Sequence, residues 1–277
     1  MDENRKIYQT YNLAHYEDGF VDRYMQDFVC EEPLLINVDD KPYSVIMRTP
    51  GDEIAHAAGF CFSEGLVEYL EDIASIGFSN DFDENSVLVR LSEERKNLVF
   101  KQIERRKFPS KTSSGMCGSE MIEDLSSKLR VVDEESVISY RQVYECVEKF
   151  FSHQEYYVRT RGTHAVMLFD SSLDIIVKAE DVGRHSAMDK SIGALFLENR
   201  LSDVFLAVLT SRISFGMIQK AARGGIPILI STSNPTSMAV EVGLKLNMTL
   251  VCLDKKSGFI VPCGENRVRA NPLQSKP

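Results

Sequence analysis

Three apolar runs in the second half of the chain are each followed by a short polar corner and then by a helical pattern. The runs span residues 173–177, 204–209 and 226–230. Buried strands that alternate with helices are typical of an α/β fold, and the carboxyl ends of parallel strands lie along one edge of the sheet. The repetition therefore predicts that the three corners meet at one sheet edge, where open α/β sheets bind ligands.

The predicted corners carry side chains that suit an anion. Arg184 and His185 open the helix after the first run, Ser211 and Arg212 follow the second run, and residues 231–236 follow the third. Free N–H groups at a helix start, together with guanidinium and hydroxyl groups, can hold a phosphate. Because Ser, Thr and Asn are also ordinary helix caps, a purely structural role for each corner is the alternative.

The net charge limits the partners of the chain. Its 277 residues carry a formal net charge of -9, which argues against a broad surface for nucleic acid or anionic membranes. No apolar run approaches the roughly 20 residues of a membrane span, and no apolar signal segment follows residues 1–6. We therefore expect a cytoplasmic protein with no nucleic acid and no membrane partner.

Composition divides the chain into three parts. Residues 1–107 are predicted to form a small α+β domain, with a hairpin over 33–48 that turns through a four-residue loop and a helix from Asp52 to near Gly65. Small residues in the middle of that helix indicate close packing on another element. Residues 108–134 are small, polar and rich in breakers, as in a mobile loop and linker, and residues 135–277 form the larger α/β domain.

The six cysteines are scattered without close pairs, which indicates reduced thiols and no zinc-ribbon site. Cys117 differs from the others because Gly115 and Gly118 leave its sulfur unscreened and basic residues precede its loop. Cationic neighbours lower a thiol pKa and raise the thiolate fraction. Cys117 is therefore the candidate catalytic residue, as a thiol that carries a group between two sites. An incidental loop cysteine, or a hydrolytic dyad with His164 or His185, are the alternatives.

The order of elements after residue 139 resembles the cytidine deaminase-like three-layer α/β fold with a mixed sheet. A zinc deaminase needs H-x-E or C-x-E at the first corner and P-C-x-x-C at the second. Residues 184–187 read Arg-His-Ser-Ala and residues 211–214 read Ser-Arg-Ile-Ser, so we expect no metal site and no deamination.

Several long motifs are spread over nearly the whole chain. They are residues 180–185 with Asp189 and Lys190, then 211–214, 221–227 and 234–236, and in the first part 59–60 with 64–65. Together they resemble the formate dehydrogenase accessory sulfurtransferase family, FdhD.

The resemblance implies a sulfur carrier protein. Members take persulfide sulfur from a cysteine desulfurase and transfer it to the molybdenum cofactor, bis-molybdopterin guanine dinucleotide, before formate dehydrogenase receives that cofactor. The cofactor is carried and not permanently bound, and GDP is a partial mimic of it. The resemblance also implies a cytoplasmic homodimer.

The resemblance assigns the persulfide to Cys117. The family loop usually reads C-G-x-C-G, whereas residues 114–118 read Ser-Gly-Met-Cys-Gly, so one of the two thiols is missing here. This loss leaves open the alternative of a non-catalytic chaperone that binds guanine nucleotide or the cofactor without chemistry.

The resemblance also implies a cofactor-binding segment near the end of the chain, beside the strand-end residues Arg184, His185, Ser211 and Arg212. The segment consists of Leu253, Asp254, Lys255, Lys256, Ser257 and Gly258. An Arg expected in the family is Lys255 here, which keeps a point charge for phosphate and loses a bidentate contact.

Overall fold

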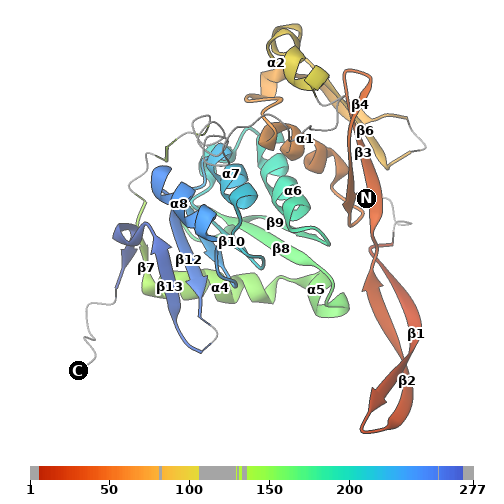
Figure 1. Ribbon diagram of the computed structural model, residues 1–277, viewed down its shortest axis with the longest axis vertical. Coiled ribbons are helices and arrows are strands. Elements are labelled where there is room, and N and C mark those ends of the chain that lie inside the picture. The colour runs from red at the N-terminus through yellow and green to blue at the C-terminus, as the bar shows by residue number, and fades with distance from the viewer. Residues whose placement is uncertain are drawn as a thin grey trace, which may run out of the picture.

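The computed structural model of the chain, shown in Figure 1, describes residues 6–80, 83–105, 129, 131–132, 136–254 and 256–270. Two of the predicted site residues, Cys117 and Lys255, lie outside the described residues.

A six-stranded mixed sheet forms the centre of the second half, in the order β13-β12-β11-β10-β8-β9. The strands are β8 (His164–Phe169), β9 (Ile175–Asp181), β10 (Leu206–Leu209), β11 (Ile228–Ser231), β12 (Thr249–Leu253) and β13 (Phe259–Cys263). β10, β11 and β12 are parallel, and β8 is antiparallel to both β10 and β9. β9 therefore runs in the same direction as β10, and the predicted meeting of strand ends at one edge is confirmed.

Helices cover both faces of this sheet, which makes three layers (Figure 1). α4 (Tyr140–Ser152) lies on one face, and α6 (Arg184–Leu197), α7 (Phe215–Arg223) and α8 (Ser237–Lys245) lie on the other. Alternate residues of β10 divide between the two cores: Leu206 and Val208 pack on the α4 side, and Ala207 and Leu209 on the α6 side. The mixed α/β prediction is confirmed, and the cytidine deaminase-like description stays a prediction.

The first part contains a four-stranded sheet in the order β4-β3-β6-β5. It consists of β3 (Glu32–Val38), β4 (Lys41–Arg48), β5 (Ile73–Phe78) and β6 (Ser86–Leu91), with α1 (Glu53–Ser63) and α2 (Glu93–Arg105). The predicted hairpin is present, but its turn has two residues and not four. Asp39 and Asp40 both have positive φ, 48° and 62°, which closes a two-residue turn and pairs Val38 with Lys41.

The two parts of the chain share one hydrophobic core, because α1 packs directly on α6. A Cβ at Gly59 would lie 1.9 Å from the Asp189 carbonyl oxygen, and a Cβ at Gly193 would lie 1.8 Å from the Ala55 carbonyl oxygen. The helices therefore touch backbone to backbone, which confirms the close packing predicted for α1. The boundaries 1–107, 108–134 and 135–277 stay a prediction.

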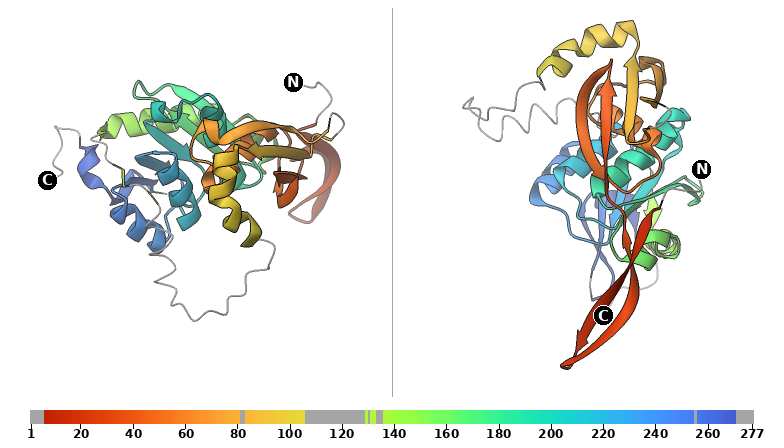
Figure 2. Two further views of the ribbon diagram at one scale, coloured as in Figure 1. Left: turned by 90° about the horizontal axis from the view of Figure 1, so that it is seen from above. Right: turned by 90° about the vertical axis from the view of Figure 1, so that its right-hand side faces the viewer.

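A long hairpin, β1 (Tyr8–Glu17) and β2 (Phe20–Val29), projects from the body (Figures 1 and 2). The remaining elements are short: α5 (Glu155–Thr160), a pair formed by β7 (Ile138–Ser139) and β14 (Val268–Arg269), and three 3₁₀ turns, η1 (Leu70–Asp72), η2 (Leu201–Asp203) and η3 (Glu265–Arg267). Within the described part of the chain, every helix is too short or too polar to cross a bilayer.

Candidate functional site

Hydrogen bonds join the strand ends at the common edge. The His164 Nδ1 lies 3.2 Å from the Thr210 hydroxyl, which accepts a bond from the Ala165 N–H at 3.0 Å. The Thr232 hydroxyl donates to the Thr210 carbonyl at 2.9 Å. These bonds fix the start of β8 and the ends of β10 and β11 relative to one another, so the polar side chains at this edge have set positions.

Strand alternation decides which polar side chains face the α4 side of this edge. Thr210 and Thr232 continue the α4-facing registers of Val208 and Ile230. Ser211, the residue named from the sequence, is instead buried, and its hydroxyl donates to the Arg212 carbonyl at 3.3 Å. A ligand-binding role for Ser211 stays a prediction, and counting in steps of two from Val208 adds Thr210 as a hydroxyl on the α4 side.

A cavity of about 380 Å³ opens beside these threonines. The Gln154 side chain is 3% exposed, and its amide nitrogen has no hydrogen-bond partner in the part of the chain that the structure describes. Arg161 lies over the Tyr157 ring, with 5.2 Å between the guanidinium carbon and the ring centroid. An aromatic ring, an unpaired amide donor and a cation suit a planar heterocycle that carries phosphate. The lining is Phe151, Gln154, Tyr157, Arg161, Gly162, Thr163, His164, Thr210 and Thr232.

Arg184 and His185 make the first corner electropositive. Burial and then the Arg184 charge lower the pKa of His164, whereas Asp181 opposes this effect. Burial, Lys220 and Arg184 lower the pKa of His185 to about 4. Both rings are therefore neutral at pH 7 in a cationic field, which an anion would relieve. The Nε of Arg184 is buried and has no partner among the described residues, which leaves one donor of this guanidinium unsatisfied.

A buried ion pair stabilises the first corner, the turn between β9 and α6. The Lys190 ammonium lies 2.8 Å from an Asp181 carboxylate oxygen, and both side chains are at most 2% exposed. Asp181 also accepts bonds from the N–H groups of Gly183 at 2.8 Å and Thr49 at 3.1 Å. The Thr49 hydroxyl in turn accepts from the Val182 N–H at 3.0 Å. The end of β4 thereby fixes the backbone that presents Arg184 and His185.

A second buried pair links α6 to α7. The Lys220 ammonium lies 2.7 and 2.8 Å from the two Asp189 carboxylate oxygens, and the Ser63 hydroxyl donates to Asp189 at 2.7 Å. His56 on α1 is fully buried, and neither ring nitrogen has a hydrogen-bond partner among the described residues. Burial, followed by the charges of Lys190 and Lys220, holds the pKa of His56 well below its ordinary value.

The His56→Leu variant should lose less stability on acidification than the wild-type protein. Below about pH 6.5 the unfolded chain protonates His56, whereas the folded chain keeps it neutral. The free energy of unfolding therefore falls by up to about 1.4 kcal/mol for each pH unit of acidification. Because the pKa of His56 is lower in the folded than in the unfolded protein, the protein has its full stability above the unfolded pKa and loses stability as pH falls below it. Thermal unfolding between about pH 7 and about pH 5 measures the slope. The exposed His153→Leu is the control, and an unchanged slope in His56→Leu would contradict the assignment.

The predicted segment 253–258 lies at the same edge, after β12. Asp254 orders this turn: its N–H donates to the Gly258 carbonyl at 3.0 Å, and its carboxylate accepts from the Lys256 N–H at 2.8 Å. Leu253 packs against the α4-side core, and Lys256 and Ser257 are exposed. Asp254 is therefore engaged in shaping the turn, and Lys256 and Ser257 are its described polar groups open to a ligand.

The thiols of the described residues are poorly suited to nucleophilic chemistry. Cys61 is fully buried, burial raises the pKa of Cys146 and of Cys252 to about 12, and it also raises the pKa of Cys30 and Cys263. A thiol with a raised pKa holds little thiolate at pH 7. The prediction for Cys117 itself falls outside the described residues.

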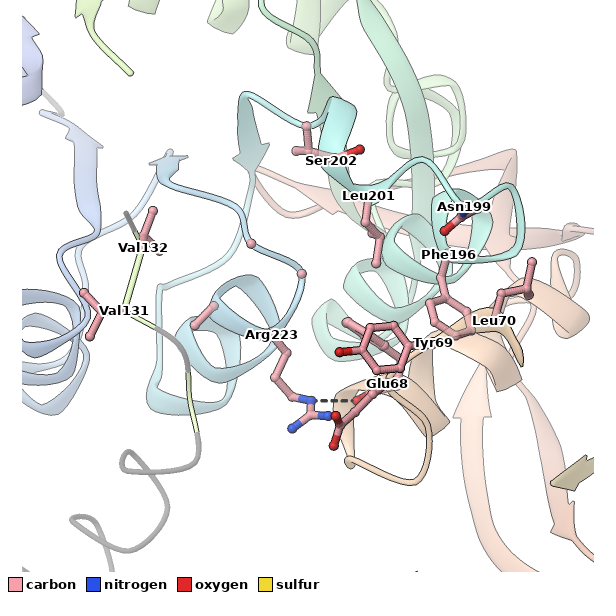
Figure 3. A pocket seen from close by; sticks show the side chains of 15 residues that line it. Glu68, Tyr69, Leu70, Val131, Val132, Phe196, Asn199, Leu201, Ser202 and Arg223 are labelled. Atoms are coloured by element: carbon pink, nitrogen blue, oxygen red, sulfur yellow. Dashed lines mark hydrogen bonds between the residues drawn. The ribbon is translucent and has the colours of Figure 1, made fainter. Parts of the chain in front are cut away.

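A larger cavity of about 660 Å³ lies at the opposite ends of the parallel strands (Figure 3). It has aromatic walls that include Phe62 and Phe196, and Glu68 places a carboxylate at its border. Arg223 is the one cation among its described lining residues, and its Nε donates to the Phe62 carbonyl at 2.7 Å. This cavity therefore suits an anion less well than the strand-end edge does.

Within the described ranges, no group of three or more His, Cys, Asp and Glu side chains is arranged to hold a metal ion.

Comparisons with known proteins point to one family. The model of the FdhD/NarQ family matches residues 29–269. Sulfur carrier protein FdhD of Sulfolobus acidocaldarius is 34% identical over 246 residues, which cover 88% of this chain and 92% of that protein. The protein of the same name from Streptomyces coelicolor is 30% identical over 276 residues, which cover 95% and 96%. A crystal structure of a proposed formate dehydrogenase accessory protein from Desulfotalea psychrophila shares the fold, with a TM-score of 0.75 at 20% identity over 95% of this chain and 100% of that one.

Proposed function

Because the chain belongs to the FdhD/NarQ family, we propose that it is a sulfur carrier in the maturation of formate dehydrogenase. In this proposal the Cys117 thiolate attacks the outer sulfur of a cysteine desulfurase persulfide. The bond between the two desulfurase-bound sulfurs breaks, the desulfurase cysteine leaves as a thiolate, and Cys117 becomes the persulfide. The acceptor of the sulfur is the molybdenum cofactor, bis-molybdopterin guanine dinucleotide, in the cytoplasm. Two copies form the homodimer that the family resemblance implies.

The observation that carries the cofactor part of the proposal is the electropositive strand-end edge. The unpaired Nε of Arg184 and the exposed Arg212 offer donors for phosphate. The cavity with the unpaired Gln154 amide offers a place for a planar base. Lys256 and Ser257 lie at the same edge, and Lys255 belongs to the same proposed segment. These groups fit a guanine dinucleotide held at its nucleotide end.

The alternative is a cofactor-binding chaperone without sulfur chemistry. The single observation in its favour is Ser114, which stands where the family loop usually has the first of its two cysteines. A disulfide between two loop thiols is therefore impossible, and sulfur transfer must proceed through Cys117 alone.

A labelling experiment separates the two functions. The full chain is incubated with a cysteine desulfurase and cysteine, and its intact mass is measured without reductant. We expect the wild-type protein to gain the mass of sulfur and Cys117→Ala to gain none. Cys30→Ala is the matched control, because its half-buried thiol has a raised pKa, and it should label like the wild type. Equal labelling of Cys117→Ala would refute the role of that residue.

GDP binding and formate dehydrogenase activity complete the test. Arg184→Ala should weaken GDP binding about tenfold or more, because it removes a charge-assisted hydrogen bond. Cys117→Ala should bind GDP like the wild type and fail to support formate dehydrogenase. If Cys117→Ala still supports the enzyme while Arg184→Ala or Arg212→Ala does not, the chaperone function is correct.

A further inference from the structure

The hairpin β1–β2, residues 8–29, is an arm that lacks a core of its own. Its side chains include some of the most exposed large apolar groups of the described chain: Tyr16 is 74%, Phe20 79% and Met25 63% exposed. Among the described residues, the body holds the arm at its base, where Arg159 of α5 pairs with Asp27 and lies 3.6 Å from the centroid of the Tyr8 ring. A two-stranded hairpin is marginally stable by itself in water, so the outer half of the arm needs a covering surface.

Each face of the arm carries large apolar side chains among polar ones. The strand register puts Tyr16 opposite Val21 on one face and Leu13 opposite Tyr24 on the other. On the second face, aromatic rings meet edge to face, with centroids 5.9 Å apart for Tyr11–Phe28 and 5.8 Å apart for His15–Tyr24. A surface that covers the arm must therefore offer apolar contacts along its length.

The outer face of the β3–β4 hairpin is a matching uncovered surface. Leu34 and Ile36 point into the core, whereas the alternate positions face outward. On that outward side Val45 is 64% exposed and Met47 is 48% exposed. β4 is also an edge strand of its sheet, and no described helix lies over this side in the right-hand view of Figure 2.

The arm and the β3–β4 hairpin lie end to end along the long axis of the molecule, because β2 continues into β3 through residues 30–31 (Figure 1). A two-fold rotation about an axis at this junction places the arm of each copy beside the β3–β4 hairpin of the other. Such a contact is the same on both copies and closes at two. Each copy takes part in this contact twice, through one face of the two 10-residue arm strands and through the outer face of its β3–β4 hairpin, toward the roughly 20–30 residues a side of a standard interface.

We propose that the arm of each protomer packs on the outer face of the β3–β4 hairpin of a second copy, and that this exchange of arms forms the dimer interface. The inference rests on the homodimer of the proposed function and adds the surface that builds it. One contact then covers both sets of exposed apolar side chains, whereas pairing of the arms with each other would leave Val45 and Met47 in water.

Sedimentation of the full chain at micromolar concentration tests the proposal. The wild-type protein should sediment at twice the 31.3 kDa chain mass. The arm variant Phe20→Ser/Tyr24→Ser, whose two exposed side chains share one face of the arm, and the face variant Val45→Lys/Met47→Lys should each weaken the dimer by about a hundredfold or more, because each removes two apolar contacts. Leu98→Ser on α2, 75% exposed and away from the interface, is the control and should stay dimeric.

A photo-cross-linking amino acid at position 20 identifies the contacted surface. We expect cross-links from this position to the β3–β4 hairpin of a second copy, and cross-links elsewhere would overturn the assignment. A wild-type monomer would contradict both the dimer of the proposed function and this interface. The surface that covers the arm would then belong to a different protein. A dimer that persists in the arm or the face variant would defeat the interface alone.

Discussion

Replacing Lys220 by Met should lower the free energy of unfolding by about 3–5 kcal/mol, because the change leaves a buried carboxylate without its cation. Asp189 is 2% exposed, and Lys220 contacts both of its carboxylate oxygens at 2.7 and 2.8 Å. Burial already raises the pKa of Asp189 although Lys220 and Ser63 oppose that shift. Without Lys220 the carboxyl group protonates more readily, so the loss should shrink as pH falls. Urea unfolding at two pH values measures both effects.

The companion variants isolate the ion pair. Asp189→Asn in the Lys220→Met background removes the stranded charge and keeps an acceptor for Ser63, so it should recover much of the loss. Lys178→Met breaks the exposed pair with Glu155 and should cost less than about 1 kcal/mol. A Lys220→Met variant as stable as Lys178→Met would show that the buried pair contributes little.

The two buried pairs explain how the fold presents the strand-end edge. Asp181 and Lys190 fix the backbone before Arg184, whereas Asp189 and Lys220 fix the spacing between α6 and α7. Gly216 at the start of α7 lies against the His185 ring, where a Cβ would come within 2.9 Å of the ring carbon Cε1. Charges buried beneath the corners thus set the position of the charges that face a ligand.

The meeting of the corners at one sheet edge could be predicted because it follows from local patterns. Apolar runs with helical patterns between them identify the parallel strands, and parallel strands end at one edge. It is harder to predict which face of the sheet each side chain at a strand end points to, since this depends on where the strand ends. Thr210 lines the cavity, whereas the next residue, Ser211, is buried.

The sequence does not reveal contacts between residues far apart in the chain. The Thr49 carbonyl accepts a hydrogen bond from the Lys190 ammonium across 141 residues, and the Ser63 hydroxyl donates one to Asp189 across 126 residues. In the sequence these groups look like ordinary polar residues of two helices and of the turn before the first helix. The arm was not predicted, because β1 mixes polar and apolar residues without the alternation of a half-buried strand. Both of its faces are exposed within one chain, so the usual signal is missing.

Substituting Gly193 by Ala should destabilise the protein by about 3 kcal/mol or more, because no side chain fits where α1 and α6 touch. The new Cβ would lie 1.8 Å from the Ala55 carbonyl oxygen and 2.6 Å from the Gly59 nitrogen. Both atoms belong to the backbone, so relief requires the helices to separate. Gly77→Ala in β5 is the matched control, since a Cβ there meets nothing within 4 Å and φ is not positive.

The same substitution connects helix packing to the strand-end edge. α6 begins at Arg184, so separation of α6 from α1 moves the guanidinium and the His185 ring away from the corner after β10. Gly193→Ala should therefore weaken GDP binding even at temperatures where the variant remains folded, whereas Gly77→Ala should leave it unchanged. Thermal unfolding and GDP titration of the two variants measure both effects. A Gly193→Ala protein with wild-type stability would contradict the backbone contact between the helices.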